Sequence, residues 1–455
     1  MTDEYAGDAA EADGDGDVGR CFSTRARVQA MLDVEACLAE AEAALDIIPA
    51  SSALAIRAAA VADLYDVEAI AAESRRAGNL AIPLVHHLTR HVGEADEHAS
   101  RYVHWGATSQ DIIDSGLVLQ LRASVPIVLH DLRRAANAAA GHARRHVFTA
   151  MPGRTWLQQA TPITFGLKAA GWCDALMRVQ RGLQEAFDAA LVLQFGGASG
   201  TLAALGTRGL EVAATLGACL RLTVPALPWH THRDRVAALA CALGVATGTL
   251  GKIGRDLGLL AQTEVGEAHE RPGDAGGSST MAHKQNPVRA AIALAAAVRA
   301  PGLVATVLSA MPQEHERALG GWQAEWDTVP ELVIVTGGAA RAIAEALEGL
   351  VVDGARMRGN LELTHGLVMA EAITMRLAPH LGKSEAHARV EAAARRAIAE
   401  GAPLADVLAQ DPAVTAVLDR AEIDATLRPE NYLGAAVAFV TSVLEARDAD
   451  EAAPE

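Results

Sequence analysis

Apolar residues recur along the middle of the chain at the spacing of α-helices. Three stretches show this pattern most clearly, at 117–132, 239–260 and 332–350. Their apolar positions are Leu117, Leu121, Val125, Val128 and Leu132, then Leu239, Leu243, Leu250, Ile253, Leu257 and Leu260, and finally Leu332, Val335, Ala339, Ile343, Leu347 and Leu350. Steps of three, four and seven residues place side chains on one face of a helix. The pattern predicts three long helices, which bury such faces by packing nearly parallel in a bundle.

Glycine is repeated within the second stretch, at Gly244, Gly248, Gly251, Gly254 and Gly258. Each glycine in a helix interior costs about 1 kcal/mol relative to alanine. Two interpretations are open: neighbouring helices approach closely at these positions, or the helix is loosely specified and kinked. Apolar residues persist between the glycines, which favours close packing.

The composition agrees with a helical protein of more than one domain. The chain has 455 residues, which predicts two or three domains, and 51% of them are hydrophobic, which is enough for a large core. Only 4% are aromatic, whereas alanine is abundant. Because alanine loses no side-chain entropy in a helix, this composition predicts an all-α fold.

Acidic residues outnumber basic ones, and the formal net charge is −17. A negative field of this size repels nucleic acid and anionic lipid, so we expect neither nucleic acid nor a membrane as a partner. The field also repels acidic substrates, so a site for such a substrate must carry its own cations. Part of the charge lies in acidic ends at 1–19, which has too few apolar residues to fold, and at 445–455.

The five cysteines show no metal-binding spacing, and we expect buried free thiols in a reducing compartment. The N-terminus is acidic rather than signal-like, and we expect no apolar run long enough to span a bilayer, which together predict a cytoplasmic protein. The histidines at 86–87 and 230–232 lack carboxylates at a matching spacing, so we expect them to be solvated or hydrogen-bonded rather than bound to metal.

Three segments interrupt the helical pattern with polar residues, glycine and proline, and functional residues often lie in such loops. The first, at 104–111, reads His-Trp-Gly-Ala-Thr-Ser-Gln-Asp. Ser109 or Asp111 can cap the helix that follows, and the N–H groups at the start of that helix would suit a carboxylate. A capping loop without a ligand explains these residues equally well.

The second segment, at 153–164, offers Arg154, Thr155 and Gln158 to a carboxylate or its hydrogen-bonded neighbours. An ordinary helix start explains the same residues and is favoured when the segment is taken alone.

The third segment, at 273–287, combines a glycine pair with two serines, a lysine and an asparagine. Glycine allows backbone shapes closed to other residues, so this loop can close over a substrate. It would then present N–H donors, a hydroxyl and a cation, which can stabilise a carbanion next to a carboxylate. The alternative, a flexible linker, fits the mixture of Met, Lys and Asn-Pro less well.

This third segment resembles the signature loop of the fumarase/aspartase superfamily, GSS-x-M-x-x-K-x-NP. It reads Gly277-Ser278-Ser279-Thr280-Met281, then Lys284, then Asn286-Pro287. It departs from the usual pattern at Ala282, where proline is common, and at Gln285, where a basic residue is common. The first two segments resemble the other two conserved regions of the superfamily, and the resemblance covers roughly residues 20–440.

The resemblance implies a three-domain helical chain that needs no cofactor. The domains would be an N-terminal helical domain at 20–112, a central long five-helix bundle at 113–352 and a C-terminal helical domain at 353–444. It also implies a homotetramer with a twenty-helix core, in which each active site takes its three loops from three subunits.

Members of the superfamily add or remove a group β to a carboxylate through an enediolate-like intermediate. The resemblance implies Ser278 as the base and Lys284 as the cation that stabilises the negative charge. The residues that it implies for substrate binding are His104, Thr108, Ser109, Arg154, Thr155, Trp156, Gln158, Ser279, Met281 and Asn286.

The segments at 104–111, 154–160, 227–231 and 315–326 further resemble the lactone-forming cycloisomerases of protocatechuate breakdown in the β-ketoadipate pathway. Trp156 stands where many amine- and amide-eliminating relatives have a histidine as general acid, and an indole N–H cannot supply a proton at neutral pH. In lactone formation the substrate's own ionised carboxylate is the nucleophile, so no amine leaving group needs a proton. The substrate is a small tricarboxylate, and the expected cations are Arg317, Lys284 and Arg154, with His104 as a lesser one.

Two other functions remain open from the sequence. One is another elimination reaction of the superfamily, such as adenylosuccinate cleavage, against which Trp156 counts. The other is a scaffold without catalysis, against which Ser278, Lys284 and Asn286 count. The proton donor is also open, because both Ser278 and Lys284 could deliver the proton.

Overall fold

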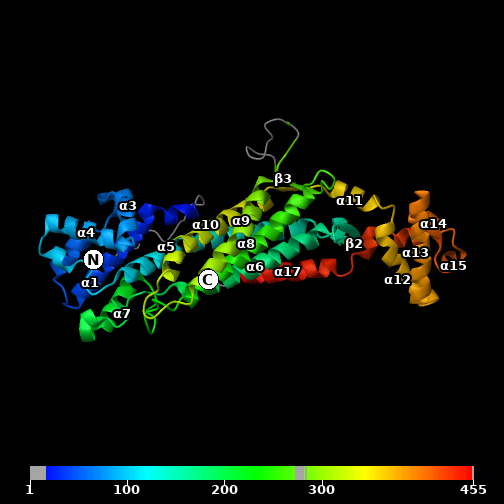
Figure 1. The fold of residues 1–455 in the computed structure, drawn as a ribbon. Helices are drawn as coiled ribbons and strands as arrows, with labels where there is room; N and C mark the ends of the chain where they lie inside the picture. Colours follow the sequence, from blue (N-terminus) through cyan, green and yellow to red (C-terminus); the bar gives the residue numbers. More distant parts are fainter. Residues whose placement is uncertain (1–16, 272–280, 282–283, 453–455) are drawn as a thin grey trace. The chain divides into compact units, whose positions relative to one another are not determined.

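The computed structural model describes residues 17–271, 281 and 284–452. Most of these residues are helical, and the strands form two short antiparallel pairs. The pairs are β1 (Ala150–Thr155) with β2 (Gln158–Thr164) and β3 (Ala268–Glu270) with β4 (Leu350–Val352). Figure 1 shows these elements coloured along the chain. The predicted all-α fold class is confirmed.

Five long helices agree with the predicted central bundle. They are α5 (Ser109–Arg145), α6 (Phe165–Ala190), α8 (Asp234–Leu260), α9 (Val288–Ala310) and α10 (Gly321–Glu348). The threonines of α8 and α10 meet in the core, where the hydroxyls of Thr247 and Thr336 lie 2.8 Å apart.

Shorter elements precede, interrupt and follow the long helices. The first group is η1 (Val18–Phe22), α1 (Thr24–Ala44), α2 (Ala50–Ala59), η2 (Ala62–Leu64), α3 (Val67–Ala77), α4 (Ala81–Ala95) and η3 (Ala99–Tyr102). Between α6 and α8 lie η4 (Ala203–Arg208) and α7 (Gly209–Leu220). After α10 come α11 (Gly354–Glu362), η5 (Leu367–Met369), α12 (Ala370–Leu381), α13 (Lys383–Glu400), α14 (Leu404–Leu408), α15 (Pro412–Thr415), α16 (Arg420–Thr426), η6 (Pro429–Tyr432) and α17 (Ala436–Ala452).

The chain groups into two compact units, and neither is continuous in sequence. The first unit contains the described residues up to Asp131 together with Val179–Gly248 and Ala295–Ala340. The second contains Leu132–Arg178, Thr249–Leu294 and the described residues from Arg341 onward. The division into consecutive domains at 20–112, 113–352 and 353–444 stays a prediction.

The apolar faces read from the sequence form the core of the long helices. Every apolar position of the three predicted faces is at most 8% exposed. Leu350, the last of them, lies in β4 rather than in a helix. The helical period therefore identified these buried faces correctly.

The glycines of α8 have two kinds of surroundings. A side chain at Gly244 would meet Val304 of α9 at 2.7 Å, and one at Gly254 would meet the carbonyl oxygen of Ala290 at 3.0 Å. These two positions confirm close helix packing. At Gly248 and Gly258 an added Cβ would meet nothing within 4 Å, so close packing within the chain does not explain those two glycines.

Parts of both predicted acidic tails are helical in the described residues. Residues 1–16 and 453–455 lie outside the described residues, but Val18 of the expected 1–19 tail begins η1 and is 7% exposed. The expected 445–455 tail is helical through Ala452 as the end of α17. Buried Arg447 explains this, because its Nε donates to Asn137 at 3.1 Å and its Nη2 donates to Glu451 at 2.6 Å.

The prediction that no apolar run can span a bilayer is wrong. By length and composition, α5, α8 and α9 could each cross a membrane. The chain itself buries 72% of the most apolar window of α5 and 56% of that of α8, but only 22% of that of α9. The described part of the chain therefore leaves most of the apolar surface of α9 uncovered.

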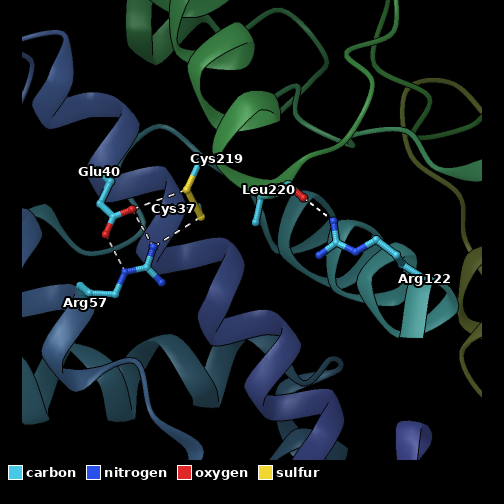
Figure 2. The surroundings of a disulfide bond; sticks show 6 residues. All are labelled: Cys37, Glu40, Arg57, Arg122, Cys219 and Leu220. Carbon is cyan, nitrogen blue, oxygen red and sulfur yellow. Dashed lines mark hydrogen bonds and ion pairs between the residues drawn. A yellow bond between two sulfur atoms is a disulfide. The ribbon is translucent and has the colours of Figure 1, made fainter. Parts of the chain in front are cut away.

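The prediction of free cysteines is also wrong for one pair. Cys37 of α1 and Cys219 of α7 form a disulfide, whose surroundings Figure 2 shows. Cys173 is a buried free thiol as expected, and Cys21 and Cys241 are free and half-buried.

Candidate active site

Asp111, in the first turn of α5, fixes the first predicted loop. Its Oδ2 accepts hydrogen bonds from the N–H groups of Thr108 at 3.0 Å and Gly197 at 2.9 Å. Its Oδ1 accepts from the N–H of Gly196 at 3.0 Å and lies 2.8 Å from Nε2 of His230. The bond back to Thr108 is half of a capping box. The protein itself thus uses Asp111 as a cap, and His230 is hydrogen-bonded as predicted.

Arg317 lies between α9 and α10 and reaches this same loop. Its Nη1 donates to the hydroxyl of Thr108 at 2.8 Å, and its Nη2 donates to the carbonyl of Ala198 at 3.0 Å. The Nε of Arg317 is buried and, in the part of the chain described, has no hydrogen-bond partner. A solvated surface arginine is therefore excluded, and the structure brings together two residues predicted for the site.

His104 forms a hydrogen bond with a carboxylate of α1. Its Nδ1 lies 2.6 Å from Oε1 of Glu35, which is 1% exposed. The backbone of His104 has φ +59°, in the left-handed region that non-glycine residues rarely adopt. Burial lowers the pKa of His104, but the charge and hydrogen bond of Glu35, with the charge of Asp111, raise that pKa above its ordinary value. The arrangement favours a positively charged imidazole.

A buried cluster of charges ties α5 to α10 beneath the loop. Arg233, just before α8, donates from Nη1 to Asp114 at 2.7 Å and from Nε to Glu325 at 3.1 Å. The indole N–H of Trp322 donates to Asp114 at 2.9 Å, and the guanidinium lies 4.6 Å from the ring centre of Trp229. Burial lowers the pKa of Arg233, but the two carboxylates raise it above its ordinary value. This fully paired cluster holds the start of α5 in place.

The second predicted segment is a β-hairpin, so its interpretation as a helix start is wrong. Thr155 pairs with Gln158 across a two-residue turn made by Trp156 and Leu157. Both turn residues have positive φ, 52° and 64°, a conformation that usually calls for asparagine or glycine. Trp156 is 97% exposed and Leu157 is 79% exposed. A strained turn that presents two large apolar side chains to solvent is typical of a functional site rather than of a structural turn.

Arg154, in β1 of this hairpin, already binds a carboxylate of the protein. Its Nη1 and Nη2 donate to the two oxygens of Glu267 at 2.8 and 2.6 Å. Glu267 is fully buried and also accepts from Nδ2 of Asn360 at 2.7 Å. This differs from the expectation that Arg154 is a cation for the substrate, because both of its terminal nitrogens face Glu267. Arg154 therefore anchors the hairpin.

The third segment is described only in part. Ser278 and Ser279 lie outside the described residues. Met281 is 43% exposed, and the N–H of Lys284 donates to the carbonyl of Met281 at 3.0 Å. Lys284 is exposed and Asn286 is half-buried, just before α9 begins. Both polar side chains thus follow the loop, where they are accessible to a ligand.

The predicted residues of the described chain are divided between the two units. In the first unit, His104, Thr108 and half-buried Ser109 lie in one loop with Arg317 against it. In the second unit, the hairpin carries Arg154, Thr155, Trp156 and Gln158, and the described end of the third segment carries Met281, Lys284 and Asn286.

The sequence did not reveal the carboxylates that hold these groups. Glu35, Glu267 and Asp114 are each at most 1% exposed. One signal was available for Glu35, which is an acidic residue flanked by Val34 and Ala36 on an otherwise buried helix face. A charge at a core position indicates a paired partner, but the pattern does not say which partner.

The chain is similar to known proteins over nearly its whole length. The chain matches the family described as Lyase over residues 17–302 and the one described as Adenylosuccinate lyase C-terminus over residues 366–443. It is 53% identical to the 3-carboxy-cis,cis-muconate cycloisomerase of Pseudomonas aeruginosa, over 93% of this chain and 92% of that one. It is 52% identical to the enzyme of the same name from Bradyrhizobium diazoefficiens, over 94% and 95%. Its fold is similar to the crystal structure of the 3-carboxy-cis,cis-muconate lactonizing enzyme from Pseudomonas putida, with a TM-score of 0.91, 48% identity and coverage of 96% and 97%.

Replacing Arg233 with methionine should lower the free energy of unfolding by about 3–5 kcal/mol, because Asp114 and Glu325 would stay buried without a counter-ion. Denaturant unfolding followed by circular dichroism measures this loss. The control is Arg208→Met, which removes an exposed ion pair with Glu211 and should cost less than about 1 kcal/mol. Equal losses for the two variants would contradict the stabilising role of the cluster.

Proposed function

Because the chain belongs to the lyase family of the fumarase/aspartase superfamily, we propose that it is a cycloisomerase that closes 3-carboxy-cis,cis-muconate to carboxymuconolactone. Relatives that are about half identical over nearly the whole chain carry this activity in their names. The structural observation that carries the proposal is Trp156, which is 97% exposed at the hairpin tip. An indole can donate a hydrogen bond there, but it cannot protonate a leaving amine.

The reaction conserves all atoms of the substrate. An oxygen of one substrate carboxylate attacks the β carbon of the diene and forms the lactone C–O bond. The electron pair of the double bond moves to the α carbon and its carboxylate as an enediolate, and a proton then adds to the α carbon. The protein must hold a trianion and stabilise the negative charge that develops on the enediolate.

Arg317 is the cation best placed in the first unit to hold a substrate carboxylate. Thr108 and Ala198 fix its terminal nitrogens, so the guanidinium is positioned before substrate arrives. Its buried Nε–H lacks a partner in the described part of the chain, and an unpaired buried donor is costly. A carboxylate oxygen would satisfy it, and the charged form of His104 lies in the same loop.

Lys284 and Ser278 supply the remaining chemistry in this proposal. Exposed Lys284 stabilises the enediolate, and Ser278 exchanges the proton at the α carbon. Ser279, Met281 and Asn286 bind the substrate from the same segment. In the hairpin, Thr155, Trp156 and Gln158 contact the substrate while Arg154 anchors them through Glu267.

The active form is a homotetramer in which one site takes loops from different subunits. The uncovered apolar surface of α9 supports this, since only 22% of its most apolar window is buried within one chain. Val298 of α9 is 80% exposed, and contact with a second copy of the chain would bury this apolar side chain. Other copies rather than lipid would then cover α9, and the protein would be cytoplasmic.

A second candidate is an adenylosuccinate-type elimination, which the C-terminal match over residues 366–443 favours. One assay separates the candidates. Purified protein incubated with 3-carboxy-cis,cis-muconate should cause the absorbance of the conjugated diene to fall, whereas incubation with adenylosuccinate should release no fumarate. Fumarate release without any change in the diene would reject the cycloisomerase.

Arg317→Ala should lower kcat/KM for lactonisation by about 100-fold or more, because it removes a preorganised cation from the site. The diene assay measures the loss, and size-exclusion chromatography should show an unchanged oligomer. The exposed control Arg208→Ala should keep near-normal turnover. Near-normal turnover of Arg317→Ala would refute the role of Arg317.

The pKa of His104 should control substrate binding. Because this pKa is raised, His104 stays charged to a higher pH than usual, and KM should increase only as the pH rises through that raised pKa. Glu35→Gln removes the charge that raises the pKa, so the increase in KM should begin at lower pH. The matched control is Glu73→Gln, which alters the carboxylate 3.3 Å from His87. Identical pH profiles for the wild type and Glu35→Gln would contradict the coupling.

Sharing of sites between subunits predicts complementation. Ser278→Ala and Arg317→Ala should each be nearly inactive. Hybrids formed by co-expression should regain activity wherever a site takes Ser278 from an Arg317→Ala chain and Arg317 from a Ser278→Ala chain. Each variant expressed alone under the same conditions is the control. Activity of the hybrids no greater than the mean of the two variants would argue that each site is built by a single chain.

A further inference from the structure

A second chemical site lies around the disulfide in the first unit. Cys37 of α1 and Cys219 at the end of α7 are 182 residues apart in sequence, and their Cα atoms lie 5.8 Å apart. Figure 2 shows Glu40 and Arg57 beside the two sulfur atoms. Neither of these side chains belongs to the proposed active site.

Arg57 and Glu40 give the two sulfur atoms different surroundings. Nη2 of Arg57 lies 3.4 Å from the sulfur of Cys37, and its Nε and Nη2 each donate to Glu40 at 2.6 Å. The sulfur of Cys219 lies 3.5 Å from a carboxylate oxygen of Glu40. A thiolate would therefore be stabilised at Cys37 and destabilised at Cys219.

The two cysteines also differ in their exposure to solvent. Cys37 is 6% exposed, whereas Cys219 is exposed on the surface. An incoming thiolate can reach the sulfur of Cys219, and Cys37 is the better leaving group because Arg57 faces it. We propose that Cys37 and Cys219 form a reversible redox site, which a thiol from solution opens by attack on Cys219.

The exchange balances with a low-molecular-weight thiol as the reductant. The thiolate of the first molecule bonds to the sulfur of Cys219, the S–S bond breaks, and its electron pair leaves on Cys37. A second thiol attacks the mixed disulfide and releases Cys219. Two thiols become one disulfide, and the protein pair gains two electrons and two protons. A reducing compartment supplies such thiols.

The same side chains argue against a metal site. Ligand atoms of Cys37, Glu40 and Cys219 lie close enough together to hold one ion. Arg57, however, occupies both oxygens of Glu40 and faces Cys37. Its fixed positive charge repels a metal ion and favours a thiolate.

The disulfide joins α1, which contacts the loop at 104–111, to α7, which directly follows another element in contact with that loop. On one side, α1 carries Glu35, which pairs with His104. On the other side, Leu205 of η4, just before α7, packs so closely on Gly106 that a Cβ there would lie 2.8 Å from it. Opening the disulfide should loosen the substrate loop, a consequence that rests on the proposed function.

The site itself can be tested without any activity measurement. Oxidised full-length protein should give one cross-linked peptide pair containing Cys37 and Cys219 by mass spectrometry, and dithiothreitol should convert it to two free thiols. Arg57→Met should slow this reduction severalfold, because the thiolate that leaves on Cys37 loses the guanidinium that faces it. Arg25→Met, which removes an exposed ion pair of α1 with Asp63, should react like the wild type.

Three results would overturn the proposal. The first is the absence of the cross-linked peptide, and the second is equal reduction rates for Arg57→Met and Arg25→Met. The third is that added zinc protects the reduced cysteine pair from an alkylating reagent. A measurement on the wild type covers a failure of Arg57→Met to fold: brief treatment with glutathione should leave the mixed disulfide on Cys219. Glutathione trapped on Cys37 instead would reject the assigned order of attack.

The effect of disulfide reduction on the loop at 104–111 is measured separately. Reduction should raise KM for the tricarboxylate severalfold in the wild type and should leave KM unchanged in Cys37→Ser, with Cys241→Ser as a control that behaves like the wild type. An unchanged KM in the wild type would overturn the link to the loop. If neither redox form turns over the substrate while the thiol chemistry proceeds as described, the proposed function fails and the redox site stands.

Discussion

The pairing of Arg233 with Asp114 and Glu325 is the constraint on which the first unit depends. It joins the start of α5, the segment before α8 and the first part of α10, although Arg233 lies 119 residues from one partner and 92 from the other. A buried ion pair adds little net stability compared with an apolar core, but it tolerates only one arrangement of its members. One turn earlier in α5, Asp111 can therefore hold the backbone of Gly196 and Gly197 and the ring of His230 against the loop at 104–111.

The net negative charge of the chain affects how it can bind an acidic substrate. Under the proposed function, a protein of net charge −17 has to hold a trianion, so the cations near its site must be positioned by the protein itself. Buried Glu35 raises the pKa of His104, and Glu267 holds Arg154 next to the tip of the hairpin, where Arg154 anchors the turn. Each buried carboxylate fixes the position of a cation at short range, where the field of the distant surface charges is screened.

The helical framework could be predicted from the sequence because burial repeats with the period of the helix, as it does from Leu117 to Leu132. The first loop and its partner Arg317 could be named from motifs. Their contacts could not, since the pairs are joined by tertiary packing and not by spacing, and the same holds for Cys37 and Cys219. The hairpin was missed because Trp156 and Leu157 are residues that a tight turn normally excludes. That the acidic 445–455 segment is helical through Ala452 could not be seen either, because it depends on the contact of buried Arg447 with Asn137.

Two features that are unfavourable in a single chain have one explanation. The hairpin holds Trp156 in a strained conformation with almost its whole surface in water, and α9 leaves most of its apolar window uncovered. Strain of this kind persists only where the surroundings or the function require it. In the proposed tetramer, neighbouring subunits cover α9, and the burial of that surface offsets the cost of presenting the hairpin to a site completed by other chains. Assembly and catalysis would then depend on the same contacts, so that a separated subunit has neither a stable surface nor a complete site.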